Sequence, residues 1–171
     1  MNWRFSRLSA GGEMPRNAAD VRLFTCSFSP EAELARFTQA HPRAGGVVSF
    51  LGQVRSSSGV EAAGDAVEAL ELRHYEPLTL PAMHELAERI LGRWDLEGLL
   101  VIHRSGTMMP GDPIVLVAAA ARHRRSAFAA ADFAMDHLKS ESWFWKREKV
   151  GGQWRWVEPR AEDYQDIARW S

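Results

Sequence analysis

This chain of 171 residues has little cysteine, no long apolar run and almost no net charge. No apolar run reaches the roughly 20 residues that a helix needs to cross a bilayer, and the first residues lack the apolar core of a signal peptide. The formal net charge of −1 argues against bulk attraction to nucleic acid or to an anionic membrane. We therefore expect a cytoplasmic protein in which any electropositive site is local.

Several sequence motifs that are typical of common binding and redox sites are also missing. There is no internal repeat, P-loop, G-x-G-x-x-G or C-x-x-C pattern, which argues against the usual nucleotide and redox sites. Four histidines, His74, His84, His103 and His137, lack the spacing and carboxylate company of a metal site. We expect these histidines to be hydrogen-bonded or at the surface, with no bound metal ion and no resident cofactor.

The single cysteine, Cys26, cannot form an intrachain disulfide. It lies in an alternating segment, and no basic residue adjoins it to stabilise a thiolate. Free cysteine is among the most frequently buried residue types, so the pattern favours a buried structural thiol over a nucleophile.

What the sequence does contain is typical of one globular domain, with 46% hydrophobic and 25% charged residues. Residues 1–20 have no hydrophobic period, so we expect a flexible N-terminal extension, or a start assigned too early, ahead of a domain over residues 21–171. Strands are predicted over residues 21–28, 45–54 (buried), 67–75, 99–103 and 114–121, and helices over 30–39, 83–94 and 127–139. A turn at 109–112, a hairpin of 144–149 and 153–157, and an amphipathic tail at 161–170 complete a mixed order of helices and strands.

A basic turn, residues 122–125, lies where an apolar strand gives way to a helix. Cations at a helix N-terminus oppose the helix dipole, while the backbone N–H groups there favour an anion. The pattern therefore favours an anion site, such as one for phosphate, over a solvated basic turn.

Two lysines, Lys139 and Lys146, bracket a tryptophan-rich segment. A lysine becomes an acid, base or nucleophile when desolvation or neighbouring positive charge alters its pKa. The alternative is two ordinary cations at a helix C-terminus and in a hairpin. For Trp143, Trp145, Trp154 and Trp156 the alternation favours cross-strand aromatic packing over stacking on a pterin or a base.

The chain resembles the large, catalytic subunit of molybdopterin synthase, the MoaE family. The matching pieces cover roughly residues 21–170, in the order found in the family. They are Phe50-Leu51-Gly52-Gln53-Val54-Arg55, Val101-Ile102-His103-Arg104-Ser105-Gly106, Pro110-Gly111-Asp112, His123-Arg124-Arg125-Ser126-Ala127-Phe128, Leu138-Lys139-Ser140, Phe144-Trp145-Lys146-Arg147-Glu148 and Trp156-Val157-Glu158.

This resemblance implies an α+β, α/β hammerhead-like single domain with a mixed, mainly antiparallel sheet and a C-terminal hairpin. It also implies a homodimer within a heterotetramer that contains two small ubiquitin-like sulfur-carrier subunits (MoaD-like). The C-terminal Gly-Gly thiocarboxylate of the carrier would supply sulfur to cyclic pyranopterin monophosphate, making the dithiolene of molybdopterin. A chain with a buried cysteine fits a reaction in which the sulfur comes from a partner.

Carried over by position, the resemblance makes Lys139 and Lys146 the catalytic residues and also substrate-binding residues. Lys139 would lie against the incoming thiocarboxylate, and Lys146 would act on the opened cyclic phosphate. The other implied substrate-binding residues are Gln53, Val54, Arg55, His123, Arg124, Arg147, Glu148 and Arg160. Two departures from the family are Gln53, where a lysine is frequent, and Trp143, where a proline is common.

Two alternatives from other classes remain open at this point. A nucleic-acid-binding module would use the basic turn and the tryptophans as one basic, stacking surface, with an affinity that falls steeply with salt. A purely structural partner subunit would bind the carrier without turnover, which the presence of both lysines argues against.

Overall fold

The computed structural model describes residues 17–58, 64–140, 143–158 and 161–170. Along these residues the elements are β1 (Ala18–Phe24), α1 (Pro30–Ala40), β2 (Gly46–Gln53), β3 (Val67–His74), α2 (Glu76–Arg93), β4 (Gly98–Arg104), β5 (Gly106–Met108), β6 (Pro113–Ala121), α3 (Arg124–Ser140), β7 (Phe144–Val150), β8 (Gln153–Val157) and α4 (Ala161–Ala168). The α+β class is therefore confirmed. None of the described helices is long and apolar enough to cross a membrane.

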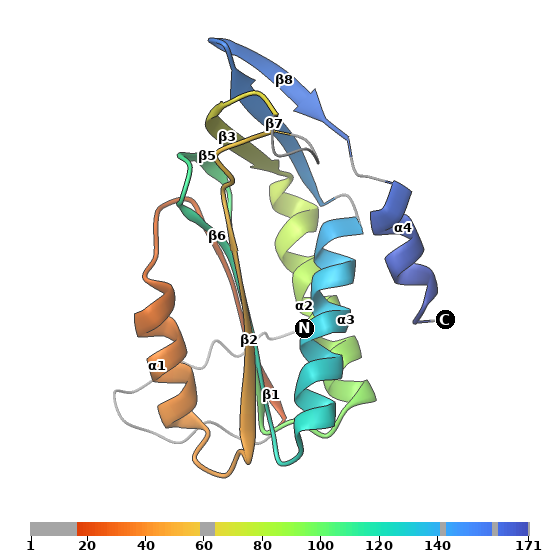
Figure 1. Cartoon of the computed structure of the whole chain (residues 1–171). Coiled ribbons are helices and arrows are strands. Elements are labelled where there is room, and N and C mark those ends of the chain that lie inside the picture. Colours follow the sequence, from red (N-terminus) through yellow and green to blue (C-terminus); the bar gives the residue numbers. More distant parts are fainter. Residues whose placement is uncertain (1–16, 59–63, 141–142, 159–160, 171) are drawn as a thin grey trace.

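The first sheet has the order β1-β4-β6-β2 and forms the centre of the molecule (Figure 1). Strand β1 runs parallel to β4, and the other neighbours are antiparallel. Helix α1 covers one face, and α2 and α3 cover the other (Figure 1). Strands β4 and β6 are buried on both faces, which explains why they appear in the sequence as continuous apolar runs rather than alternating ones.

The second sheet is antiparallel, with the order β5-β3-β7-β8. Its last two strands are the predicted hairpin, and Gly151 and Gly152 turn it with φ values of 56° and 75° that favour glycine. A small core joins this sheet to the end of the first one; its buried members are Val54, Val67, Leu70, Leu72, Met108 and Val150. The short strand β5 was not predicted, because three residues are too few for a visible period.

Helix α1 begins as the sequence predicts. The side chain of Ser29 accepts a hydrogen bond from the Ala32 backbone N–H at 3.2 Å, and Pro30 occupies the first turn. Strand β1, in contrast, begins at Ala18 and ends at Phe24, so residues 18–20 belong to the sheet rather than to an extension.

The prediction of a buried Cys26 is wrong, because this thiol is exposed. The last sheet bond on this side joins the Ser105 N–H to the Phe24 carbonyl oxygen at 2.8 Å, after which the chain leaves the sheet for α1. The apolar alternation continues to Phe28, but the strand does not. Burial therefore gives no reason to exclude Cys26 as a nucleophile.

The prediction of a buried strand over residues 45–54 is wrong in part. Strand β2 is an edge of the first sheet, and Phe50 and Leu51 expose 43% and 39% of their surface. An apolar run of this length does not distinguish a central strand from an edge strand.

Candidate functional site

The two predicted catalytic lysines lie on different elements at one end of the first sheet, where the second sheet begins (Figure 1). Lys139 is exposed and occupies the last turn of α3, where a cation is favoured by the helix dipole. Lys146 lies on β7 with 31% of its side chain exposed. The hydroxyl of Ser140 donates to the Asp136 carbonyl oxygen at 2.7 Å and so satisfies one acceptor of this helix end.

Lys146 is held by an acidic neighbour on its own strand. Its Nζ lies 2.8 Å from Oε1 of Glu148, which is only 7% exposed. Residues two apart in a strand share a face, so Lys146 and Glu148 both lie on the face that carries Leu72 and the small junction core. The predicted residues Lys146 and Glu148 are therefore brought together, and the Glu148 carboxylate holds the Lys146 ammonium group in place.

Arg147 lies on the opposite face of β7. Its Nε donates to Glu71, and this hydrogen bond lowers the pKa of the Glu71 carboxyl group. The guanidinium carbon stands 4.6 Å from the ring centre of Trp154 and 5.7 Å from that of Trp156. Within one chain, Arg147 is thus turned away from Lys146.

The predicted cross-strand packing of tryptophans is not what the register shows. The partner of Trp145 is Arg73, that of Trp156 is Arg147, and that of Trp154 is Lys149. The aromatic rings alternate with cations because the hairpin turn sets this register, which the sequence period alone does not specify. Trp143 precedes β7 and packs against the main core.

Arg55 follows the end of β2 and reaches the same end of the molecule as the lysines. The preceding residue, Val54, is 4% exposed and packs in the junction core with Leu72. Its N–H donates to the Asp112 carbonyl oxygen at 3.0 Å, and its own carbonyl oxygen accepts from the Gly111 N–H at 2.9 Å. Gln53 adds a bond from Nε2 to the Gly111 carbonyl oxygen at 3.1 Å. The end of β2 is therefore tied to the 109–112 turn.

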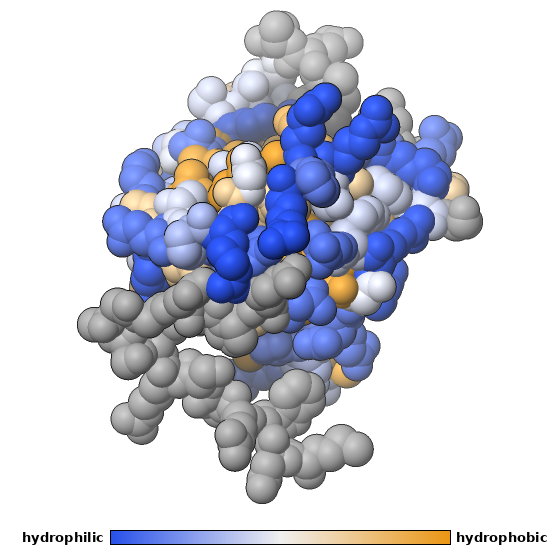
Figure 2. Space-filling model, turned by 90° about the horizontal axis from the view of Figure 1, so that it is seen from below, coloured by the Kyte–Doolittle hydropathy of each residue, from blue (hydrophilic) through white to orange (hydrophobic). Residues whose placement is uncertain are grey.

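The basic turn lies at the other end of α3. Arg124 is the first residue of the helix and Lys139 comes 15 residues later, which corresponds to roughly 22 Å along the helix axis. Arg122, His123, Arg124 and Arg125 are all exposed, and Figure 2 shows this end of the molecule from below as a largely hydrophilic surface. Arg122 is tied to the buried Glu97, with 3.6 Å between Nε and Oε1. One chain therefore does not bring His123 and Arg124 together with the lysines.

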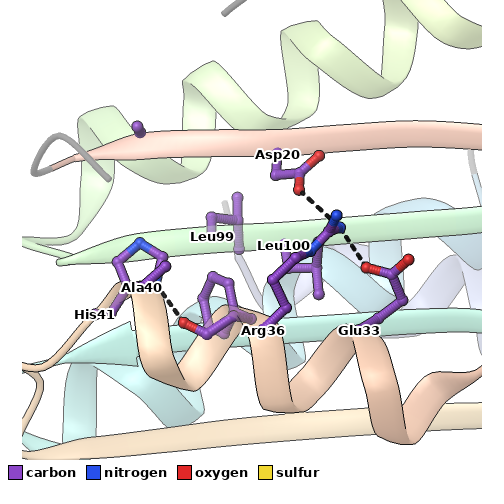
Figure 3. A pocket seen from close by; sticks show the side chains of 9 residues that line it. Asp20, Glu33, Arg36, Ala40, His41, Leu99 and Leu100 are labelled. Atoms are coloured by element: carbon purple, nitrogen blue, oxygen red, sulfur yellow. Dashed lines mark hydrogen bonds and ion pairs between the residues drawn. The ribbon is translucent and has the colours of Figure 1, made fainter. Parts of the chain in front are cut away.

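A small cavity of about 30 Å³ lies elsewhere, between α1 and strands β1 and β4 (Figure 3). It is lined by Asp20, Glu33, Arg36 and His41 among others, and Arg36 joins both carboxylates there. None of the predicted site residues that the structure describes lines it. Predicted Arg160 lies outside the described residues.

Comparison with known proteins identifies the family, which the geometry of a single chain does not. The family model described as "MoaE protein" matches residues 25–141. The chain belongs to the MoaE family. It is 43% identical over 150 residues to the molybdopterin synthase catalytic subunit of Ralstonia nicotianae, covering 88% of this chain and 83% of that protein. The same subunit of Escherichia coli is 45% identical over 126 residues, covering 74% of this chain and 81% of that protein.

Solved MoaE structures agree with the fold. The MoaE protein of Burkholderia ambifaria superimposes with a TM-score of 0.73 at 38% identity, covering 89% of this chain and 97% of that one. A chain in a complex of subunits 1 and 2 of the molybdopterin-converting factor from Helicobacter pylori shares the fold, with a TM-score of 0.65 at 15% identity over 82% and 91% of the two chains.

Two MoaE-like motif residues received no role from sequence reasoning, namely His103 and Arg104. His103 is 6% exposed, stacks on Phe144 with 4.0 Å between ring centres, and has Nδ1 3.0 Å from the Arg104 carbonyl oxygen. Burial lowers its pKa to about 4, so the ring is neutral at pH 7. This confirms the prediction of a hydrogen-bonded histidine. The sequence feature that could have indicated a role for both residues is the His103-Arg104 motif at the end of a fully buried strand.

Proposed function

We propose that this chain is the catalytic subunit of a cytoplasmic molybdopterin synthase. It transfers sulfur from the C-terminal thiocarboxylate of a small carrier subunit to cyclic pyranopterin monophosphate, which becomes the dithiolene of molybdopterin. The observation that carries the proposal is the similarity to curated catalytic subunits over 88% of the chain, with both lysines present. The convergence of Arg55, Lys139 and Lys146 at one end of the fold supports it.

The residues of this end supply positive charge for an anionic reaction. The ammonium group of Lys146 is held 2.8 Å from Glu148, so it acts as a fixed donor and cation. Lys139, exposed at the helix end, lies against the thiocarboxylate and stabilises the charge that develops as sulfur attacks. Arg55 holds the phosphate of the substrate.

A second copy of the chain completes this site. One small substrate does not touch both ends of α3, which lie roughly 22 Å apart. If His123 and Arg124 contact the same molecule as the lysines, they come from the other chain of a homodimer. Each substrate then lies between the basic turn of one copy and the lysine end of the other, the end that carries Arg55, Lys139 and Lys146. The cations at the helix start, which the helix dipole disfavours, then have an anion to bind.

The small carrier is the other partner that we propose. Its thiocarboxylated Gly-Gly tail extends to the lysine end, where Lys139 is exposed at the surface of a single chain. The two-subunit complex formed by the Helicobacter pylori chain of the same fold is consistent with such a heterotetramer.

The nucleic-acid alternative is disfavoured by the arrangement of its two parts. The exposed Trp145 and Trp156 lie in the second sheet, whereas residues 122–125 lie at the far end of the first (Figure 1). The basic turn and these tryptophans therefore do not form one surface within the chain, and the cations paired with the tryptophans are those of β3 and β7 instead.

The deciding experiment measures molybdopterin formed from cyclic pyranopterin monophosphate and a thiocarboxylated carrier. We expect product with the wild-type chain and a loss of at least about 100-fold with Lys139→Ala. Lys149→Ala is the matched control, since Lys149 lies on β7 but faces away from Lys146 and is paired with Glu68 at 3.5 Å. Equal yields from wild type and Lys139→Ala would refute the proposed role of the lysine.

A further inference from the structure

Arg104 is a buried cation that the proposed chemistry does not use. It ends β4, is 8% exposed, and has Nη1 3.3 Å from Oδ2 of Asp112. Among the described residues its Nε is buried without a hydrogen-bond partner. Burying a guanidinium group that lacks some of its hydrogen-bond partners costs free energy. A role limited to bracing the turn does not account for this cost.

Asp112 organises the turn that follows β5. The carboxylate oxygen that meets Arg104 also accepts a hydrogen bond from the Met109 N–H at 3.0 Å. The Asp112 N–H donates to the Met109 carbonyl oxygen at 3.0 Å, and Gly111 has a φ of 89°, which favours glycine. The Asp112 carboxylate thus links the Arg104 guanidinium group to the backbone of this turn.

This turn, rather than the sheet, holds the end of β2. The register between β2 and β6 shifts between Gly52 and Gln53, where regular pairing ends. Beyond the shift, Val54 exchanges two backbone hydrogen bonds with the turn, at 3.0 Å and 2.9 Å. The next residue is Arg55, so the direction in which Arg55 leaves the sheet is set by the position of the turn.

We propose that Arg104 and Asp112 form a positioning pair that aims Arg55 at the phosphate of the substrate. The inference rests on the proposed function, because it assigns the pair to the phosphate-binding step of that reaction. Arg104 is a positioning residue rather than a catalytic one, since it acts through Asp112, the turn and Val54. It gives a role to two sequence motifs, His103-Arg104 and Pro110-Gly111-Asp112, that the lysine chemistry leaves unexplained.

The test uses Asp112→Asn in the complete assembly with a thiocarboxylated carrier. Asparagine retains the size of the side chain and an acceptor for Met109, but removes the charge that holds Arg104. We expect the KM for cyclic pyranopterin monophosphate to rise about tenfold, because a small displacement of a binding group is costly, while kcat changes less than about twofold. Arg104→Lys keeps the charge without the forked geometry and should give a smaller rise in KM.

A double variant separates positioning from general destabilisation. If Arg104 and Asp112 act through Arg55, the KM of Asp112→Asn/Arg55→Ala equals that of Arg55→Ala alone. Multiplicative effects in the double variant would overturn the proposal, as would an unchanged KM in Asp112→Asn and Arg104→Lys. Glu33→Gln is the control, because Glu33 forms a half-buried pair with Arg22 at 2.6 Å away from the turn, and its KM should equal that of wild type.

The two proposals fail in different ways. Absence of product from the wild-type assembly would remove the proposed function itself. Product formation with the same KM in the wild type and in the Asp112 and Arg104 variants would leave that function intact and refute only the positioning pair. If Asp112→Asn does not fold, Arg104→Lys with its own Arg55→Ala double variant carries the same comparison.

Discussion

The two ends of helix α3 both carry cations, but in opposite electrostatic settings. Lys139 lies in the last turn, where the helix dipole favours a positive charge. Arg124 and Arg125 lie in the first turn, which contains no acidic residue, so the same dipole opposes them. A cation in an unfavourable place points to an anion that binds there, whereas a cation in a favourable place needs other evidence for a function. For the lysine end the function is a proposal that rests on family membership, whereas the basic turn adds an electrostatic argument of its own.

The sharpest test of this comparison mixes two inactive chains. We expect Arg124→Ala and Lys139→Ala each to reduce molybdopterin formation by about 100-fold. When the two variants are refolded together at equal concentration, half of the dimers are mixed, and each contains one intact site. Activity should return to about a quarter of the wild-type value.

Recovery in the mixture depends on the two ends coming from different chains. A matched mixture of Lys139→Ala with Lys146→Ala serves as the control, since both residues lie at the same end and no intact site forms. No recovery in the first mixture would show that the ends do not share a substrate across the dimer.

The lysine end also contains a buried histidine with a lowered pKa, His103. Because the folded pKa of His103 is about 4 and the ordinary value is 6.5, the folded state disfavours the protonated ring. Its contribution to stability is complete above pH 6.5 and is lost as the pH falls from 6.5 through 4, by about 3 kcal/mol in all. Chemical denaturation between pH 7 and pH 4 measures this loss, and His103→Phe should reduce the slope over that range. An equal slope in both proteins would contradict the assignment.

A third test concerns the C-terminal helix, which packs beside the lysine end of α3. The Asp136 carboxylate accepts bonds from Arg169 Nε and Nη2 at 2.9 and 2.7 Å and from Trp170 Nε1 at 2.6 Å, and is 8% exposed. We expect Asp136→Asn to lower the free energy of unfolding by about 1–3 kcal/mol, because it weakens charge-assisted bonds to a buried group. Asp132→Asn, at a residue that is half exposed and 2.8 Å from Arg169, should cost less than about 1 kcal/mol.

The smallest effect is expected at the basic turn. Replacing Arg125 by glutamate puts an acid in the first turn of α3 and should stabilise the protein by about 0.3–1 kcal/mol. Thermal unfolding at low and high salt measures it, and the gain should shrink with salt. A destabilised Arg125→Glu protein would mean that the cations at this end support the fold itself.

Local chemistry was the predictable part of the fold. Ser29 with Pro30 marked the start of α1, Gly151-Gly152 marked the hairpin, and apolar periods placed α3, the central strands and the part of α2 from Met83 onward, although the first seven residues of α2 (76–82) were not predicted. The errors share a cause. Cys26, β2 and the tryptophans depend on which strand is an edge, where a strand ends and how two strands are registered. These are properties of pairing between distant segments, and no local period encodes them.

The sequence by itself determined the family and indicated the candidate site residues. Its ordered motifs led to Lys139, Lys146 and Arg55, and the family membership is confirmed by the match over residues 25–141. Only the tertiary structure decided that the end of β2 before Arg55 is tied to the 109–112 turn and packs with Leu72, the partner of Lys146, while His123 and Arg124 lie at the far end of α3. The physical reason is the stiffness of the helix between them. Fifteen residues of α-helix keep their ends roughly 22 Å apart, so neighbours in the motif order become opposite ends of the molecule.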